Sequence, residues 1–132
     1  MVKEFSLSKN ERLSSRKSIS SLFETGRSIY APPLRIIYKL EAEDPHALAM
    51  AVSVPKRLFK RAVDRNLLKR RIREAYRLNK SDLYKTLEQK ELKIKLVIQY
   101  QQKEIAGFHA IEEGLLKGMT KLLQKLDEQE SN

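Results

Sequence analysis

The feature that constrains this chain most is a segment of 25 residues, from Lys56 to Lys80, that holds nearly all of its positive charge. The segment carries eleven Lys and Arg side chains against Asp64 and Glu74, a net charge of +9, whereas the whole chain of 132 residues carries +10. Apolar residues recur within it at intervals of three and four, the spacing of an amphipathic helix. The segment therefore predicts a long basic helix, about residues 57 to 79, held in place by the rest of the chain.

The cations of this helix are expected to lie on one side. At about 100° per residue they form a polar stripe roughly 140° wide without an acidic residue. The stripe consists of Arg65, Asn66, Lys69, Arg70, Arg73, Arg77 and Lys80. Apolar residues border it on both flanks, with Leu68, Ile72, Ala75 and Tyr76 on one and Val63, Leu67 and Leu78 on the other.

A nucleic-acid partner explains this stripe better than a solvated face does. Stacked like charges cost a few tenths of a kcal/mol per pair in an isolated helix, and a purely structural surface rarely keeps that cost. Arginine, which outnumbers lysine in the stripe, has a planar fork that suits phosphates and unpaired bases. The stripe therefore favours RNA.

Three stretches of alternating apolar residues predict β-strands outside the basic helix. They are residues 34–40, 48–54 and 92–100. The first two lie close enough to pair as a hairpin, whereas a helix between the last two is typical of parallel strands. This order predicts an α+β fold around a sheet of about four strands, with a basic crossover helix.

Two further helices are expected, and we expect helices to cover one side of the sheet. One helix spans roughly 15–25, and the other begins at Phe108, with apolar residues every three or four positions as far as Leu126. A chain of this length suits one domain, which we place at residues 1–127. The last residues, 128–132, are expected to fray.

Nothing in the sequence predicts chemistry carried by the protein itself. The chain has no cysteine, which excludes disulfides and thiolate zinc sites and is typical of a cytoplasmic protein. His46 and His109 lack partners at metal-ligand spacing, and the short acidic clusters are typical of solvated surface. No stretch is long and apolar enough to span a membrane. We therefore expect no catalytic residue, metal site, bound cofactor, small-molecule substrate or membrane partner.

Two other classes of nucleic-acid-binding protein stay open at this point. A non-enzymatic ribosomal or RNA-assembly protein would have the same composition and the same basic helix. A DNA-binding protein would place that helix in a major groove, although strands flank it and no helix-turn-helix pair is predicted. Composition alone does not choose between the RNA-binding classes.

The segment from Ala62 to Tyr76 resembles the signature of the ribonuclease P protein family, an Arg-Asn-Arg motif followed by Lys-Arg and a further Arg. Leu67 stands where the motif has its second arginine. Residues 52–57, and 5–13 followed by 23–26, also resemble the family, so the similarity covers nearly the whole chain. The residues that match the motif are Arg65, Asn66, Lys69, Arg70 and Arg73.

This resemblance implies a subunit of ribonuclease P, in which a large RNA holds the catalytic magnesium ions and removes the 5′ leader of precursor tRNA. The basic helix would bind that RNA through Arg65, Asn66, Lys69, Arg70, Arg73 and Arg77. A cleft between the first helix and the sheet would take the single-stranded leader. Its lining would be Phe23, Tyr38, Ser53, Lys56 and Arg57.

The resemblance also bears on the leader cleft and on the fold. Aromatic faces stack on any base, so Phe23 and Tyr38 would suit a leader of arbitrary sequence, whereas Ile19 stands where relatives often carry another aromatic. The implied fold is that of ribosomal protein S5 domain 2, with a left-handed strand-helix-strand crossover. That hand is opposite to the one that the ordinary rule for parallel strands would predict.

Overall fold

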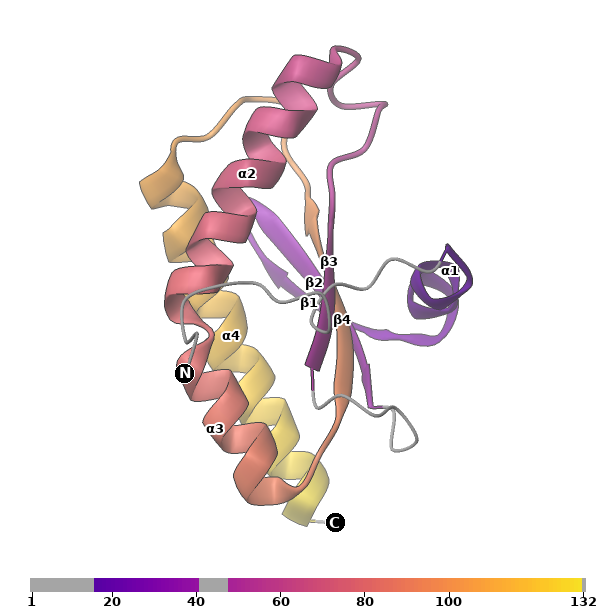
Figure 1. Ribbon diagram of the computed structural model, residues 1–132, viewed down its shortest axis with the longest axis vertical. Helices are drawn as coiled ribbons and strands as arrows, with labels where there is room; N and C mark the ends of the chain where they lie inside the picture. Colours follow the sequence, from indigo (N-terminus) through magenta and orange to yellow (C-terminus); the bar gives the residue numbers. More distant parts are fainter. Residues whose placement is uncertain (1–15, 41–47, 132) are drawn as a thin grey trace, which may run out of the picture.

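A four-stranded sheet lies between one helix and a layer of three in the computed structural model, which describes residues 16–40 and 48–131. Helices α2, α3 and α4 cover one face, and α1 crosses the other (Figure 1). The elements are α1 (Arg16–Thr25), β1 (Arg27–Ala31), β2 (Leu34–Leu40), β3 (Leu48–Ser53), α2 (Ala62–Asn79), α3 (Ser81–Lys90), β4 (Ile94–Tyr100) and α4 (Phe108–Ser131). This arrangement confirms the α+β prediction.

The strand order is β1-β2-β4-β3, with β4 antiparallel to β2 and parallel to β3. The predicted hairpin between residues 34–40 and 48–54 is therefore wrong, because β4 lies between these two strands. Five of the seven β4 residues are buried, on both faces of the sheet, as expected of a central strand rather than an edge. The hairpin partner of β2 is β1, a strand that the sequence analysis did not predict.

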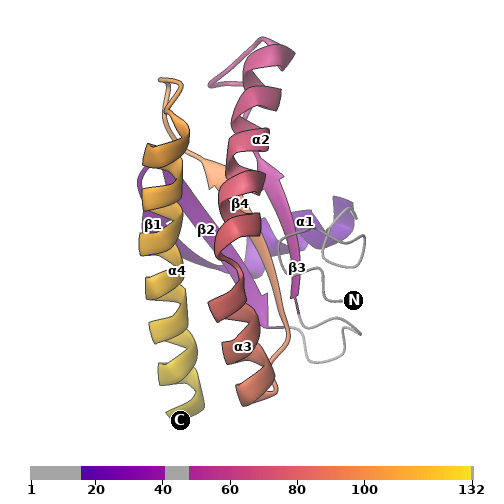
Figure 2. The ribbon, with the colours of Figure 1, turned by 60° about the vertical axis from the view of Figure 1, so that its left-hand side comes forward.

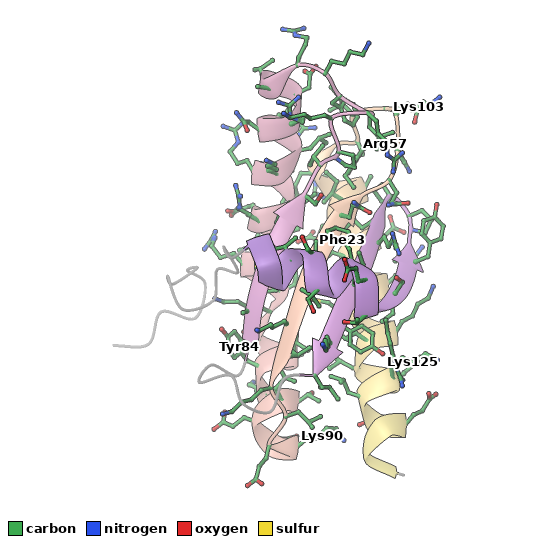
Figure 3. The ribbon with its side chains drawn as sticks, turned by 90° about the vertical axis from the view of Figure 1, so that its right-hand side faces the viewer. Phe23, Arg57, Tyr84, Lys90, Lys103 and Lys125 are labelled. Atoms are coloured by element: carbon green, nitrogen blue, oxygen red, sulfur yellow. The ribbon has the colours of Figure 1, made fainter. Side chains whose placement is uncertain are left out.

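The connection from β3 through α2 and α3 to β4 joins neighbouring parallel strands. Figure 3 views the sheet from the α1 side, with the helical layer behind it and both strands pointing upward. In this view β4 lies to the right of β3, which is the left-handed sense of crossover. The hand implied by the family resemblance is thus present, against the usual preference.

Two apolar clusters hold the layers together. The larger one fills the space between the sheet and the three-helix layer, where α2 and α4 run side by side (Figure 2). The smaller one lies under α1 and has three buried members, Leu22, Ile37 and Val97, with Ile19 and Ala51 packed against it. Helix α1 is therefore held mainly by one short row of contacts, and most of the other residues on that sheet face are polar.

The basic segment differs from its prediction at both ends. Helix α2 begins at Ala62 rather than near residue 57, because the amides of Leu58 and Phe59 bond back to the Pro55 carbonyl in a turn. At the other end the chain turns at Lys80 into α3, a helix that was not predicted. Lys80 is only 3% exposed and its ammonium lies 5.5 Å from the centre of the Tyr84 ring. It does not belong to the exposed stripe.

Helix α4 runs to Ser131 and so includes most of the segment expected to fray. The predicted end of the domain at residue 127 stays a prediction. No helix in the described ranges is long and apolar enough to cross a membrane.

Two glycines allow α4 to lie close against the β1–β2 hairpin. A Cβ at Gly114 would stand 2.7 Å from the carbonyl oxygen of Pro32, and one at Gly118 would stand 2.6 Å from Cδ1 of Ile36. At the first position the obstacle is backbone, which has little freedom to move. The close contact between α4 and the β1–β2 hairpin therefore requires residues without a side chain at positions 114 and 118.

Replacing Gly114 with Ala is expected to lower the free energy of unfolding by about 1–3 kcal/mol, despite the higher helix propensity of alanine. Thr120→Ala, at an exposed position of the same helix, is the matched control and is expected to change stability by less than about 0.7 kcal/mol. Urea denaturation measures both. Equal stability of Gly114→Ala and the parent chain would contradict the close packing.

Candidate nucleic-acid interface

Helix α2 presents cations because it is anchored along one flank only. Its buried residues are Leu68, Ile72, Ala75 and Tyr76. The second predicted flank is not buried, since Val63 and Leu78 are exposed. Asn66, Arg70 and Arg73 are exposed on α2, and we call these three residues the α2 basic face. No hydrogen bond or ion pair within the described part of the chain engages the side chains of Arg70 and Arg73.

The side chain of Arg65 has a structural role in addition to its place in the predicted stripe. Its Nη1 donates to the carbonyl oxygens of Phe59 and Lys60, both at 2.8 Å, and so holds the turn that precedes α2. Phe59 in turn is buried, with its ring centre 5.8 Å from that of Tyr100. Arg65 thus fixes the start of the helix through Nη1. These two bonds do not use the other two guanidinium nitrogens, Nε and Nη2. Lys69 is half-buried.

The positive charge of Arg77 is offset by Glu74, an acidic residue at the border of the predicted stripe. Its guanidinium donates to both carboxylate oxygens of Glu74, one turn earlier. The hydrogen bond from Arg77 lowers the pKa of Glu74, and the same bond raises the pKa of Arg77. The end of the stripe near Arg77 is therefore closer to neutral than its middle.

Arg71 has a structural role that the sequence analysis missed. Its Nη1 donates to the carbonyl oxygen of Ala106, at 2.7 Å and 35 residues away, in the connection from β4 to α4. The amide of Ala106 donates in turn to the hydroxyl of buried Tyr100, whose pKa is raised by burial. No local sequence signal marks such a contact, because both partners are distant from Arg71 along the chain.

On the α1 side of the sheet, the strand register aligns one transverse row of four residues. Tyr30 lies opposite Arg35, Arg35 opposite Gln99, and Gln99 opposite Ser53. Opposed residues share a face, so these four, which we call the polar row, lie on the same side as α1. The row beside it runs from Ser28 through Ile37 and Val97 to Ala51, and its three apolar members pack under α1.

The leader-cleft residues other than Tyr38 gather around α1 and the ends of the parallel strands. Phe23 is 38% exposed on α1, and Ser53 is a member of the polar row. Lys56 and Arg57 are exposed in the turn after β3. Figure 3 shows Arg57 beyond α1 at this end of the sheet, and Lys103 toward the same end on the segment that follows β4.

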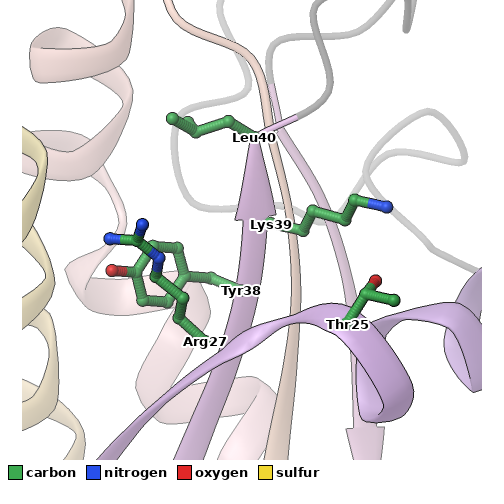
Figure 4. Close-up of a pocket in the computed structure, with 5 residues that line it drawn as sticks. All are labelled: Thr25, Arg27, Tyr38, Lys39 and Leu40. Carbon is green, nitrogen blue, oxygen red and sulfur yellow. The ribbon is translucent and has the colours of Figure 1, made fainter. Parts of the chain in front are cut away.

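Tyr38 is not part of this group, and its assignment to the leader cleft is wrong. It is 3% exposed and packs in the larger cluster, between the sheet and the three-helix layer. Its neighbour Ile37 points to the α1 side instead, because successive residues of a strand alternate between faces. Figure 4 shows Tyr38 and Arg27 on one side of β2 and Lys39 on the other, and these three residues line a pocket together with Thr25 and Leu40.

The described residues contain no cluster of three or more His, Cys, Asp or Glu side chains that could hold a metal ion. Cations dominate the surfaces around α2 and the end of β3. These surfaces suit phosphates rather than a divalent cation.

Comparison with known proteins identifies this arrangement. A family model described as Ribonuclease P matches residues 7–127. The chain belongs to the ribonuclease P protein family. It is 38% identical over 119 residues to the ribonuclease P protein component of Porphyromonas gingivalis, covering 89% of this chain and 87% of that protein. It is 40% identical over 73 residues to the component of Petrotoga mobilis, covering 55% and 59%.

Solved ribonuclease P proteins share the fold. The Staphylococcus aureus protein superposes with a TM-score of 0.68 at 21% identity, covering 85% of this chain and 94% of that one. The Thermotoga maritima protein gives a TM-score of 0.62 at 23% identity, covering 81% and 93%. Family membership supports the role of a protein subunit in ribonuclease P, a ribonucleoprotein that processes tRNA.

Proposed function

We propose that this chain binds the ribonuclease P RNA through α2 and the 5′ leader of precursor tRNA through the α1 side of its sheet. In this role it assists the endonucleolytic cut that gives the mature 5′ end of tRNA. The observation that carries the proposal is the exposure of the α2 basic face opposite a fully buried flank. Because the helix is already folded, RNA binding would have to order only the side chains of these cations and not the backbone that carries them.

Within α2 the six assigned residues would not contribute equally to the RNA subunit contact. Asn66, Arg70 and Arg73 would face the RNA directly, because they are exposed. Arg65 and Arg77 would contribute less, since one holds the preceding turn and the other is paired with Glu74. Half-buried Lys69 would extend its ammonium from the side of the same surface.

For the leader, the proposal uses Phe23, Ser53, Lys56 and Arg57. An exposed aromatic face stacks on bases of any sequence, and flanking cations follow the phosphates. Phe23 would supply the face, and the turn after β3 would supply the cations. A substrate with this leader would gain affinity over mature tRNA, which lacks it.

The chemical step itself is assigned to the RNA subunit and its magnesium ions, as the family resemblance implies. No carboxylate cluster of the described chain fits a magnesium ion, so no described residue is proposed as a ligand. The protein would act by binding and positioning, and its cations would lower the repulsion between two polyanions.

Reconstitution tests the proposed function. Adding the purified chain to a bacterial ribonuclease P RNA at low magnesium is expected to raise the rate of 5′ leader removal by about tenfold or more. Cleavage is followed by gel separation of leader and mature tRNA, and the RNA alone is the control. If the rate is unchanged across a magnesium titration while the chain still binds structured RNA, a non-enzymatic RNA-assembly role is favoured instead.

A further inference from the structure

We propose that Tyr30 and Arg35 of the polar row form a second stacking and phosphate site for the leader, at the edge of the sheet. Tyr30 stacks on a leader base, and Arg35 contacts the phosphate beside it. This inference rests on the proposed function and adds to it the residues that extend the leader path beyond α1.

Tyr30 has the exposure and the fixed position that a stacking platform needs. It is 58% exposed, although its neighbours in β1, Ile29 and Ala31, are buried on the opposite face. Its backbone is held from that side, because Nζ of Lys121 on α4 donates to the Tyr30 carbonyl oxygen at 3.0 Å. An aromatic ring in a strand is usually part of a core, whereas this ring stands on the open side of a well-anchored edge strand.

Arg35 is positioned but not neutralised. Its Nε and Nη2 donate to the hydroxyl of Ser28, at 3.2 and 2.9 Å, and this orients the guanidinium along the sheet toward β1. The hydroxyl is an uncharged partner, and no carboxylate within the described ranges forms an ion pair with Arg35. A phosphate beside the base on Tyr30 would therefore meet a cation of fixed direction.

The polar row has the dimensions of a short single strand. Four strands at about 4.8 Å spacing make the row roughly 14 Å long, the length of a few nucleotides. Tyr30 stands at one end, and Ser53 at the other end leads into the turn that carries Lys56 and Arg57. The row beside it offers no aromatic from the sheet, because its members are Ser28, Ile37, Val97 and Ala51.

This placement explains how the leader path can keep two stacking positions in this chain. The alternation of β2 turns Tyr38 into the core, so the apolar residues that the sheet places against α1 are aliphatic. Phe23 supplies one exposed ring from α1, and Tyr30 supplies another from the sheet edge. A base on each would be sequence-tolerant, because every base has a π-face.

The test uses the holoenzyme reconstituted with a bacterial ribonuclease P RNA and precursor tRNAs that carry a long leader or a single-nucleotide leader. Tyr30→Ala is expected to weaken binding of the long-leader substrate by about tenfold, the range expected for one stacked base. Tyr30→Phe keeps the ring and is expected to bind within about twofold of the parent. Leu116→Ala, another exposed apolar residue at 44%, is the matched control on α4 and should change nothing.

Two further readouts separate stacking and charge from a structural role. An abasic nucleotide moved along the leader should weaken the parent most at one position and should have no such effect at that position in Tyr30→Ala. Arg35→Gln should reduce the slope of log affinity against log salt for the long-leader substrate by about 0.7, the value for one phosphate contact on a single strand.

The outcomes distinguish this inference from the function on which it rests. If the parent holoenzyme does not prefer the long leader over the single-nucleotide leader, the proposed function fails. If the parent shows the preference and Tyr30→Ala keeps it in full, only the edge site is overturned. Equal losses for both substrates in Tyr30→Ala would also overturn it, because they would point to folding or RNA-subunit binding.

Discussion

Replacing both Arg70 and Arg73 with Ala is expected to weaken binding to ribonuclease P RNA by on the order of 100-fold. Both side chains are exposed on α2, and neither holds another part of the described chain. Each phosphate contact that is lost should flatten the plot of log affinity against log salt by about 0.9, so the double variant should lose nearly two units of slope. Filter binding across a salt series measures both quantities.

The matched control removes the same amount of charge from another helix. Lys117 and Lys125 are exposed on α4, and each forms a surface ion pair, with Glu113 and Glu128 respectively. Their double replacement with Ala should leave the salt slope nearly unchanged. If it weakens RNA binding as much as the arginine pair does, net charge rather than the α2 basic face governs association, and the assignment of that face is wrong.

The existence and side of the basic helix could be predicted from sequence because both depend on local spacing. Arg70 and Arg73 are exposed, as the apolar periodicity of the segment requires. The roles of Arg65 and Lys80 could not be predicted, because each depends on the turn at one end of the helix. The pairing of Arg77 with Glu74 follows from their i,i+3 spacing and was missed. Charge density therefore identified the surface but overestimated the number of free cations on it.

The strands were predicted better than their pairing. Residues 34–40 form β2 as expected, and β3 and β4 lie within one or two residues of their predicted bounds. Strand pairing depends on residues that are far apart in the sequence. The short connection between β2 and β3 favoured a hairpin between them, but β4 lies between these two strands in the sheet. The strand β1 was missed because its five residues give too short an alternation, and with it Tyr30 had no assigned place.

The error at Tyr38 has a definite physical origin. Alternation along β2 groups this residue with Leu34 and Ile36, and the structure confirms that all three are buried on one face. The sequence does not reveal which face α1 covers, so the family resemblance placed Tyr38 beside Phe23. In the structure Leu22 of α1 packs with Ile37, so α1 covers the face to which Ile37 points. Tyr38 is the next residue of the strand and therefore points to the opposite face.

Two neighbouring residues of α1 should respond to replacement in opposite ways. Leu22 is buried under α1 against Ile37 and Val97, and Leu22→Ala is expected to lower the free energy of unfolding by about 2–5 kcal/mol. Phe23 points outward, so Phe23→Ala should leave stability nearly unchanged and should lower affinity for precursor tRNA by about tenfold relative to mature tRNA. Urea denaturation and competition binding measure the two effects.

Because the cluster under α1 has three buried members among the described residues, the loss in Leu22→Ala should be concentrated in that helix. Amide hydrogen exchange is expected to speed up in α1 while protection in β4 and α2 is largely retained, the pattern of local unfolding rather than global loss. Leader discrimination should then fall in Leu22→Ala as well, since Phe23 loses its fixed position. A Phe23→Ala variant as unstable as Leu22→Ala would show that Phe23 packs in the core and would remove it from the leader path.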